Sequence, residues 1–148
     1  MRLSVETAIA VPRARVFHKL MDVARWPEAI TGIDSVEVLT PGPVGVGTRI
    51  RETRRMHGRL ASEVMTFAEI VAPGRLALTA ESHGTRYRIT HELTEAGAGT
   101  RLAMHFEGIP VTMLARAFTP IAWLMRGSIE RQLAADLADL KRACETAS

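Results

Sequence analysis

The sequence predicts an α+β domain in which a curved antiparallel sheet of six or seven strands wraps around one long C-terminal helix. From Ser35 to Glu107, apolar and polar residues alternate with period two between short turn signals, which indicates strands joined by hairpins. From Thr112 to Ala143, apolar residues instead recur at steps of three and four, which indicates a helix. Such a sheet is roughly 30 Å wide, whereas a helix with its side chains is ~10–12 Å across. The sheet must therefore curl around the helix, and we expect it to enclose a cavity.

The N-terminal part is predicted to supply one strand and two short helices. Alternating apolar residues from Leu3 to Ile9 indicate the strand. Pro12 suits the first turn of a helix, whose apolar face comprises Val16, Phe17, Leu20 and Met21. A second short helix is expected from Ala24 to Ile30, capped by Asp22 and ended by Gly32. Both helices would then lie between the first and second strands.

Short turns separate the remaining predicted strands, so that consecutive strands must pair antiparallel. The second strand is expected around Val36 and Val38, and the others at Thr48 to Met56, Leu60 to Val71, Leu76 to Ser82, Arg86 to Leu93, and Thr100 to Glu107. No repeat or linker divides the chain, and its 148 residues suit a single domain spanning 1–148.

The C-terminal helical segment contains one proline that predicts an interruption. Pro120 follows Thr119, and proline is favoured at the first position of a helix but costs ~3 kcal/mol inside one. We therefore expect a kink, or a separate short helix over Val111 to Phe118 that acts as a flap. Four apolar residues lie off the helical stripe and are expected to pack under the flap, in a homodimer contact through the Met113–Leu124 region, or on a membrane surface: Met113, Leu114, Trp123 and Leu124.

Composition excludes several classes of protein. Hydrophobic residues make up 47% and charged residues 24% of the chain, as in ordinary globular domains. No apolar run approaches the ~20 residues of a membrane span, so we expect no transmembrane segment. The N-terminus lacks the apolar stretch of a signal peptide, which predicts a cytoplasmic protein. The single cysteine, Cys144, can form no internal disulfide.

The sequence does not match the usual motifs for binding nucleotides, metals or nucleic acids. Gly42, Gly45 and Gly47 precede a strand, whereas glycines that bind nucleotides follow a strand and open a helix. The five histidines show no metal-ligand spacing, so we expect no metal and no cofactor. The arginines between Arg49 and Arg59 have no aromatic residues among them, which argues against nucleic-acid binding despite the net charge of +3.

Four polar residues are predicted to face the inside of the sheet. Period two turns Glu52 and Arg54 inward together, about 7 Å apart along their strand, so they pair with each other or with a polar ligand group. Tyr87 and His91 share the inner face of a later strand, and an inward histidine is either a satisfied core residue or a ligand contact. We predict a polar end to the cavity, built from Glu52, Arg54 and His91. The full set of predicted ligand-binding residues is Glu52, Arg54, Met65, Phe67, Leu78, Tyr87, His91, Met104, Phe118, Ala122 and Met125.

Several local phrases carry a family resemblance. They are Val11-Pro12 with Val16-Phe17 and Leu20-Met21-Asp22, Arg25-Trp26-Pro27, Gly45-Val46-Gly47-Thr48-Arg49, Gly99-Thr100-Arg101-Leu102, and the ending Gln132-Leu133 to Lys141. Together with the order of elements, they resemble the START-like (SRPBCC) superfamily, particularly its polyketide cyclase/dehydrase and lipid-transport branch. The resemblance covers essentially the whole chain and implies a helix-grip fold.

The resemblance implies three hypotheses for function, because members bind lipids, quinones, plant hormones or polyketides and some are enzymes. The leading one is the binding or transport of a small, largely apolar molecule. The second is a cofactor-independent cyclase, dehydratase or hydrolase, in which His91, Tyr87 and Glu52 would act as acid and base. The third is an interaction module similar to the quinone-chaperone and ribosome-associated members.

Overall fold

The computed structural model describes residues 1–146. Its elements, in chain order, are β1 (Arg2–Ile9), α1 (Arg13–Met21), the single 3-10 turn η1 (Val23–Arg25), α2 (Trp26–Ala29), β2 (Ile33–Val38), β3 (Arg49–Met56), β4 (Arg59–Val71), β5 (Arg75–Ser82), β6 (Thr85–Ala96), β7 (Gly99–Pro110), α3 (Met113–Ala117), α4 (Thr119–Leu124) and α5 (Arg126–Thr146).

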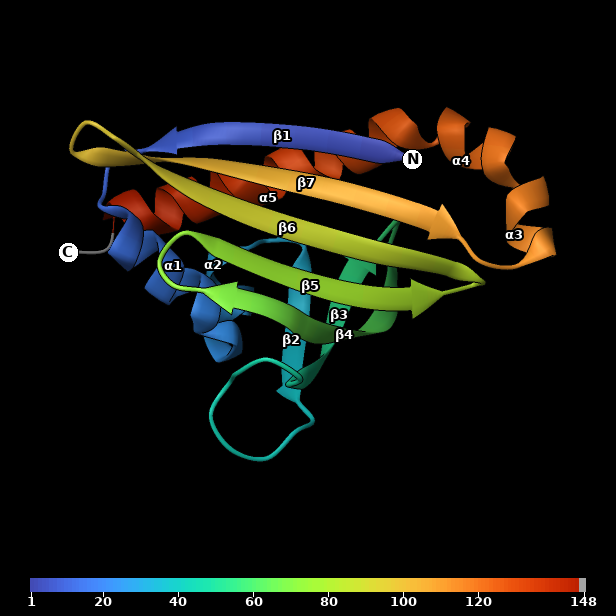
Figure 1. Ribbon diagram of the computed structural model, residues 1–148, viewed down its shortest axis with the longest axis horizontal. Helices are drawn as coiled ribbons and strands as arrows, with labels where there is room; N and C mark the ends of the chain where they lie inside the picture. The colour runs from blue at the N-terminus through green and yellow to red at the C-terminus, as the bar shows by residue number, and fades with distance from the viewer. Residues whose placement is uncertain (147–148) are drawn as a thin grey trace.

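The strands form one antiparallel sheet of seven strands in the order β1-β7-β6-β5-β4-β3-β2. Each neighbouring pair runs antiparallel. Figure 1 shows the sheet curving in front of α5, which crosses behind β1, β7 and β6. The predicted α+β helix-grip fold is therefore confirmed, including the two short helices between the first two strands.

Two kinds of local feature shape the sheet. The pairing shifts by one residue in β2 and again in β4, between Phe67 and Glu69, and such bulges bend a strand and increase its twist. The hairpin turns His57-Gly58 and His83-Gly84 have positive φ at both residues, as two-residue hairpins require. The bends turn the sheet into a trough that is open on one side.

Helix α5 closes the trough and is held beside both edges of the sheet. Next to β1, the N–H of Ala10 donates to the Glu145 carboxylate at 2.8 Å. Just before β2, the N–H of Thr31 donates to the Asp139 carboxylate at 2.9 Å. The inner face of the helix is buried as predicted, at Leu133, Leu137 and Leu140. The helix therefore connects β1 and β2, the two edge strands of an open sheet.

The predicted interruption before α5 is present. Thr112 caps α3, and its hydroxyl accepts from the N–H of Ala115 at 3.1 Å. Pro120 lies in the first turn of α4, and a second break follows at Met125. In Figure 1, α3 and α4 lie beyond the right-hand end of the sheet. Within residues 1–146, no helix has both the length and the apolar content needed to cross a bilayer.

The short helices expose a group of large apolar side chains, which we call the α3–α4 surface: Met113, Leu114, Phe118, Ile121, Trp123, Leu124 and Met125. Met113 and Leu124 are each 86% exposed, so these side chains do not pack under a flap. The Arg126 guanidinium lies over the Trp123 ring at 5.0 Å from its centre. A homodimer through this region stays a prediction.

Replacing Trp123 with aspartate is expected to abolish self-association while changing the free energy of unfolding by only about 0.5 kcal/mol, because Trp123 is 53% exposed. Sedimentation velocity measures the association, and urea denaturation measures the stability. Val46→Asp is the matched control, since Val46 is 68% exposed in a loop away from this surface. A wild-type protein that is monomeric at every concentration would contradict the predicted dimer.

Candidate functional site

A cavity of about 310 Å³ lies between the inner face of the sheet and α5. Side chains from α1, α2, β2 to β7 and α5 line it. Much of the wall is apolar, and it includes Met65, Leu78, Ile89, Met104, Phe106 and Leu133. An apolar cavity with a few polar groups is the usual form of a site for a small molecule. The polar groups on its wall therefore determine which ligands it can bind.

The structure brings most of the predicted ligand-binding residues to this cavity: Glu52, Arg54, Met65, Leu78, Tyr87, His91 and Met104. It places Phe67, Phe118, Ala122 and Met125 outside the lining. Phe67 is fully buried in the core beside the bulge in β4. The other three precede α5, and the breaks at Pro120 and Met125 direct that segment past the end of the sheet.

Arg54 is the centre of a buried ion-pair cluster. Its Nε donates to Glu52 Oε1 at 2.6 Å. Its Nη1 and Nη2 donate to Asp136 Oδ1 and Oδ2 at 3.2 and 2.7 Å, a bidentate pair that joins β3 to α5. Asp136 was not among the predicted site residues. It lies on the same helical face as Leu133 and Leu137, so a charged residue interrupting that apolar stripe was the signal that could have identified it.

Burial and ion pairing shift the pKa values of these groups in opposite directions. Burial raises the pKa of Glu52 and of Asp136, and the Arg54 guanidinium only partly offsets it. Burial would lower the pKa of Arg54, but its bonds to Asp136 and the charge of Glu52 outweigh this effect and raise it. Partial burial also raises the pKa of the more exposed Glu63, which lies opposite Glu52 on the neighbouring strand β4. Three carboxyl groups therefore surround one cation.

His91 is a second buried polar group, on β6 between Leu76 of β5 and Met104 of β7. Only 7% of it is exposed. Burial lowers the pKa of its imidazole to about 4, although a hydrogen bond to the Leu76 backbone acts in the opposite direction. Within residues 1–146, its Nδ1 atom is buried and has no hydrogen-bond partner. The ring is therefore neutral at neutral pH and has one unused nitrogen.

His91 is separate from the ion-pair cluster, although the two were predicted to form one polar end. Strands β4 and β5 lie between β3 and β6. At ~4.8 Å per strand, β3 and β6 are about 14 Å apart across the sheet, and the strand pairing places Glu52 level with Thr85, six residues before His91. No hydrogen bond or ion pair joins His91 to Glu52 or Arg54 in the described part of the chain. The cavity thus has two separate buried polar groups, and Thr79, Ser82, Tyr87 and Gln132 also line it.

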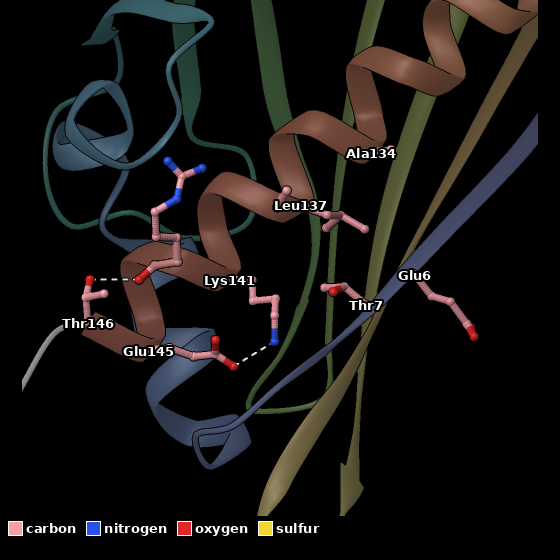
Figure 2. A pocket seen from close by; sticks show the side chains of 9 residues that line it. Glu6, Thr7, Ala134, Leu137, Lys141, Glu145 and Thr146 are labelled. Carbon is pink, nitrogen blue, oxygen red and sulfur yellow. Dashed lines mark hydrogen bonds and ion pairs between the residues drawn. The ribbon is translucent and has the colours of Figure 1, made fainter.

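A second hollow, of about 450 Å³, lies outside the core, between β1 and α5. Figure 2 shows Lys141 turned toward Glu145, one turn further along the same helix. The Lys141 ammonium is 2.8 Å from the Glu145 carboxylate and donates to the Ala8 carbonyl at 2.6 Å. These charged groups are already paired with one another and are exposed to solvent. The inner cavity, with its unpaired His91, is the better candidate site.

Comparison with known proteins assigns the family. The sequence profile of the family described as polyketide cyclase / dehydrase and lipid transport matches residues 1–145. The chain belongs to this family. Among curated proteins, none matches the chain in sequence.

Several solved structures share the fold of this chain. Protein TTHA0849 from Thermus thermophilus is 18% identical, with a TM-score of 0.79 and 97% of each chain covered. The Zhui aromatase/cyclase from Streptomyces sp. R1128 is 17% identical, with a TM-score of 0.79, 98% of this chain and 93% of that chain covered. A major latex-like protein from Panax ginseng is 13% identical, with a TM-score of 0.74 and coverage of 99% and 98%. At these identities, the similarity shows the fold alone.

For this member of the polyketide cyclase/dehydrase and lipid-transport family, the geometry limits shared catalysis by the candidate residues. Tyr87 and His91 lie four residues apart on β6, which is about 13 Å along a strand. No hydrogen bond joins the two side chains in the described part of the chain, so they do not form a preassembled acid–base pair. Glu52 is engaged by Arg54. In the described part of the chain, no group of three metal-ligating side chains is arranged to hold an ion.

Proposed function

We propose that the protein binds a small, largely apolar molecule in the cavity between the sheet and α5. The observation that carries this proposal is an apolar-walled space of about 310 Å³ with buried polar groups on its wall. A globular domain closes such a space by packing unless something occupies it, because protein interiors have few voids larger than a water molecule. Transport of the bound molecule is one use of such a site.

A cofactor-independent cyclase or dehydratase is the alternative. The observation that favours it is the neutral, buried His91, whose ring can accept a proton and whose Nδ1 has no partner within residues 1–146. Among the structural neighbours, the Zhui protein is described as an aromatase/cyclase. In the described residues, no hydrogen bond joins His91 to another acid or base, and Glu52 is paired with Arg54. Binding is therefore the leading proposal.

Filling the cavity is expected to remove ligand binding. Ala80 lines the inner cavity and Ala134 lines the outer hollow, so Ala80→Phe and Ala134→Phe place the same ring in the two spaces. The affinity for the neutral probe N-phenylnaphthylamine, measured by fluorescence, should fall about tenfold or more in Ala80→Phe and stay unchanged in Ala134→Phe. Native mass spectrometry of freshly purified protein should show a retained molecule that Ala80→Phe loses.

The two variants separate the possible sites. Loss of binding in Ala134→Phe alone would assign the ligand to the outer hollow instead. Unchanged binding in both variants would reject a cavity site altogether. Circular dichroism at increasing temperature shows whether each variant remains folded.

A further inference from the structure

The positive charge on the cavity wall is already paired with carboxylates. Arg54 is the only arginine or lysine of the wall within residues 1–146. Each of its guanidinium nitrogens donates to a carboxylate, Nε to Glu52 and both Nη atoms to Asp136. A ligand that carries a carboxylate would have to compete with these buried pairs. The wall offers such a ligand no free cation.

Negative groups outnumber positive ones around the same point. Glu63 also lines the cavity, at an exposed part of the wall opposite Glu52 on the neighbouring strand. No hydrogen bond or ion pair engages Glu63 in the described residues, and the charges that act on it are those of Arg54 and His83. Glu52 and Asp136 lie deeper, and each is less than 10% exposed. An anion entering past Glu63 would meet an excess of carboxyl groups.

His91 gives the cavity a second, unpaired polar group. Its Nδ1 is buried and has no hydrogen-bond partner within residues 1–146. A polar atom left unpaired in a buried site is costly. A ligand hydroxyl can both donate and accept, so it would satisfy Nδ1 in either tautomer of the neutral ring, whereas a carboxylate can only accept.

We infer that the cavity selects ligands that carry a hydrogen-bond donor, an amine, alcohol or phenol, over carboxylic acids with the same skeleton. The excess of carboxyl groups around Arg54 carries this choice, and the unpartnered Nδ1 of His91 offers a contact for a ligand hydroxyl. The apolar skeleton would contact Met65 and Met104 between them. This inference rests on the proposed binding function and specifies the chemical class of the ligand.

Three probes with one alkyl chain test the inference: decylamine, decanol and decanoate. Each is titrated against the complex with N-phenylnaphthylamine at pH 7, below its micelle concentration. The amine and the alcohol should displace the fluorescent probe at concentrations about tenfold or more below those of decanoate. The overall charge of +3 would by itself attract decanoate. A preference for the amine would therefore come from the cavity and not from the net charge.

Two substitutions and one control show which side chains cause the ligand preference. Glu63→Gln removes one carboxylate at an exposed position and should reduce the ratio of amine to decanoate affinity about two- to fivefold. Glu81→Gln makes the same change next to Arg86, outside the cavity lining, and should leave the ratio unchanged. His91→Phe, which removes the unpartnered Nδ1, should weaken decanol relative to decanoate.

The outcomes separate a failure of this inference from a failure of the proposed binding function. If decanoate binds most tightly of the three, the cavity binds ligands but the selection for donors is wrong. If Glu63→Gln and Glu81→Gln change the ratio equally, the preference comes from the protein surface and the inference is again wrong. If none of the probes binds, N-phenylnaphthylamine included, the proposed function itself fails.

Discussion

Replacing Arg54 with methionine is expected to lower the free energy of unfolding by about 3–5 kcal/mol at neutral pH. Methionine keeps much of the volume of the side chain but leaves Glu52 and Asp136 without the cation that pairs with them. Both carboxyl groups are buried, and a buried charge without a partner is costly. The contact between β3 and α5 would be lost at the same time.

Arg51→Met on the same strand is the matched control. Arg51 pairs with Glu37 at 2.8 Å, but its side chain is 45% exposed, so its loss should cost about 1 kcal/mol or less. Urea denaturation of both variants measures the difference. Adding Glu52→Gln and Asp136→Asn to Arg54→Met should recover part of the stability, because no unpaired charge remains. Equal stability of the two single variants would show that the cluster does not hold α5 in place.

Stability is expected to fall by about 3 kcal/mol as the pH decreases from 6.5 to 4 because of His91 alone. In the unfolded chain the imidazole takes up a proton near its ordinary pKa of 6.5, whereas burial lowers the folded value to about 4. Below pH 6.5 the unfolded state therefore binds more protons than the folded state, and protons favour unfolding. The contribution of neutral His91 is complete above pH 6.5 and is lost by the time the folded protein titrates.

The difference between wild type and His91→Phe isolates this effect. Glu52 and Asp136 act in the opposite direction, since their raised pKa values make the folded state bind protons more readily as the pH falls. Their contribution is common to both proteins and cancels in the difference. Denaturation from pH 7 to 4 should show the two curves converging or crossing as His91 becomes charged. His18→Phe, which replaces an exposed histidine of α1, is the control. Parallel curves for wild type and His91→Phe would mean that His91 is not buried as a neutral ring.

The inner face of each strand could be predicted from the sequence, because alternation has a fixed period. It correctly turned Glu52, Arg54, Tyr87 and His91 toward the cavity. Alternation carries no information about distance across the sheet, so His91 was grouped with Arg54 although two strands lie between them. The hairpin order alone would have shown this separation. The partner Asp136 comes from α5, and only tertiary packing decides which strand a helix residue meets.

The helical stripe was extended too far for a related reason. Phe118, Ala122 and Met125 continue the spacing of three and four toward α5, so they were assigned to the stripe although a kink or a separate short helix was expected at Pro120. The chain instead breaks at both Pro120 and Met125, so the segment leaves the cavity. Phe67 is a different case. It faces inward, but the bulge beside it places it in the packed core.

The attachment of α5 to both edges of the sheet has a consequence for the order of assembly. Helix α5 follows all seven strands in the chain, and its 21 residues are the part that covers the trough. Until they dock, the inner wall around Met65 and Met104 faces water. During synthesis the strands emerge first, so closure is a late event of folding. A ligand present at that moment can be enclosed while the sheet is still open, without passing through a finished wall.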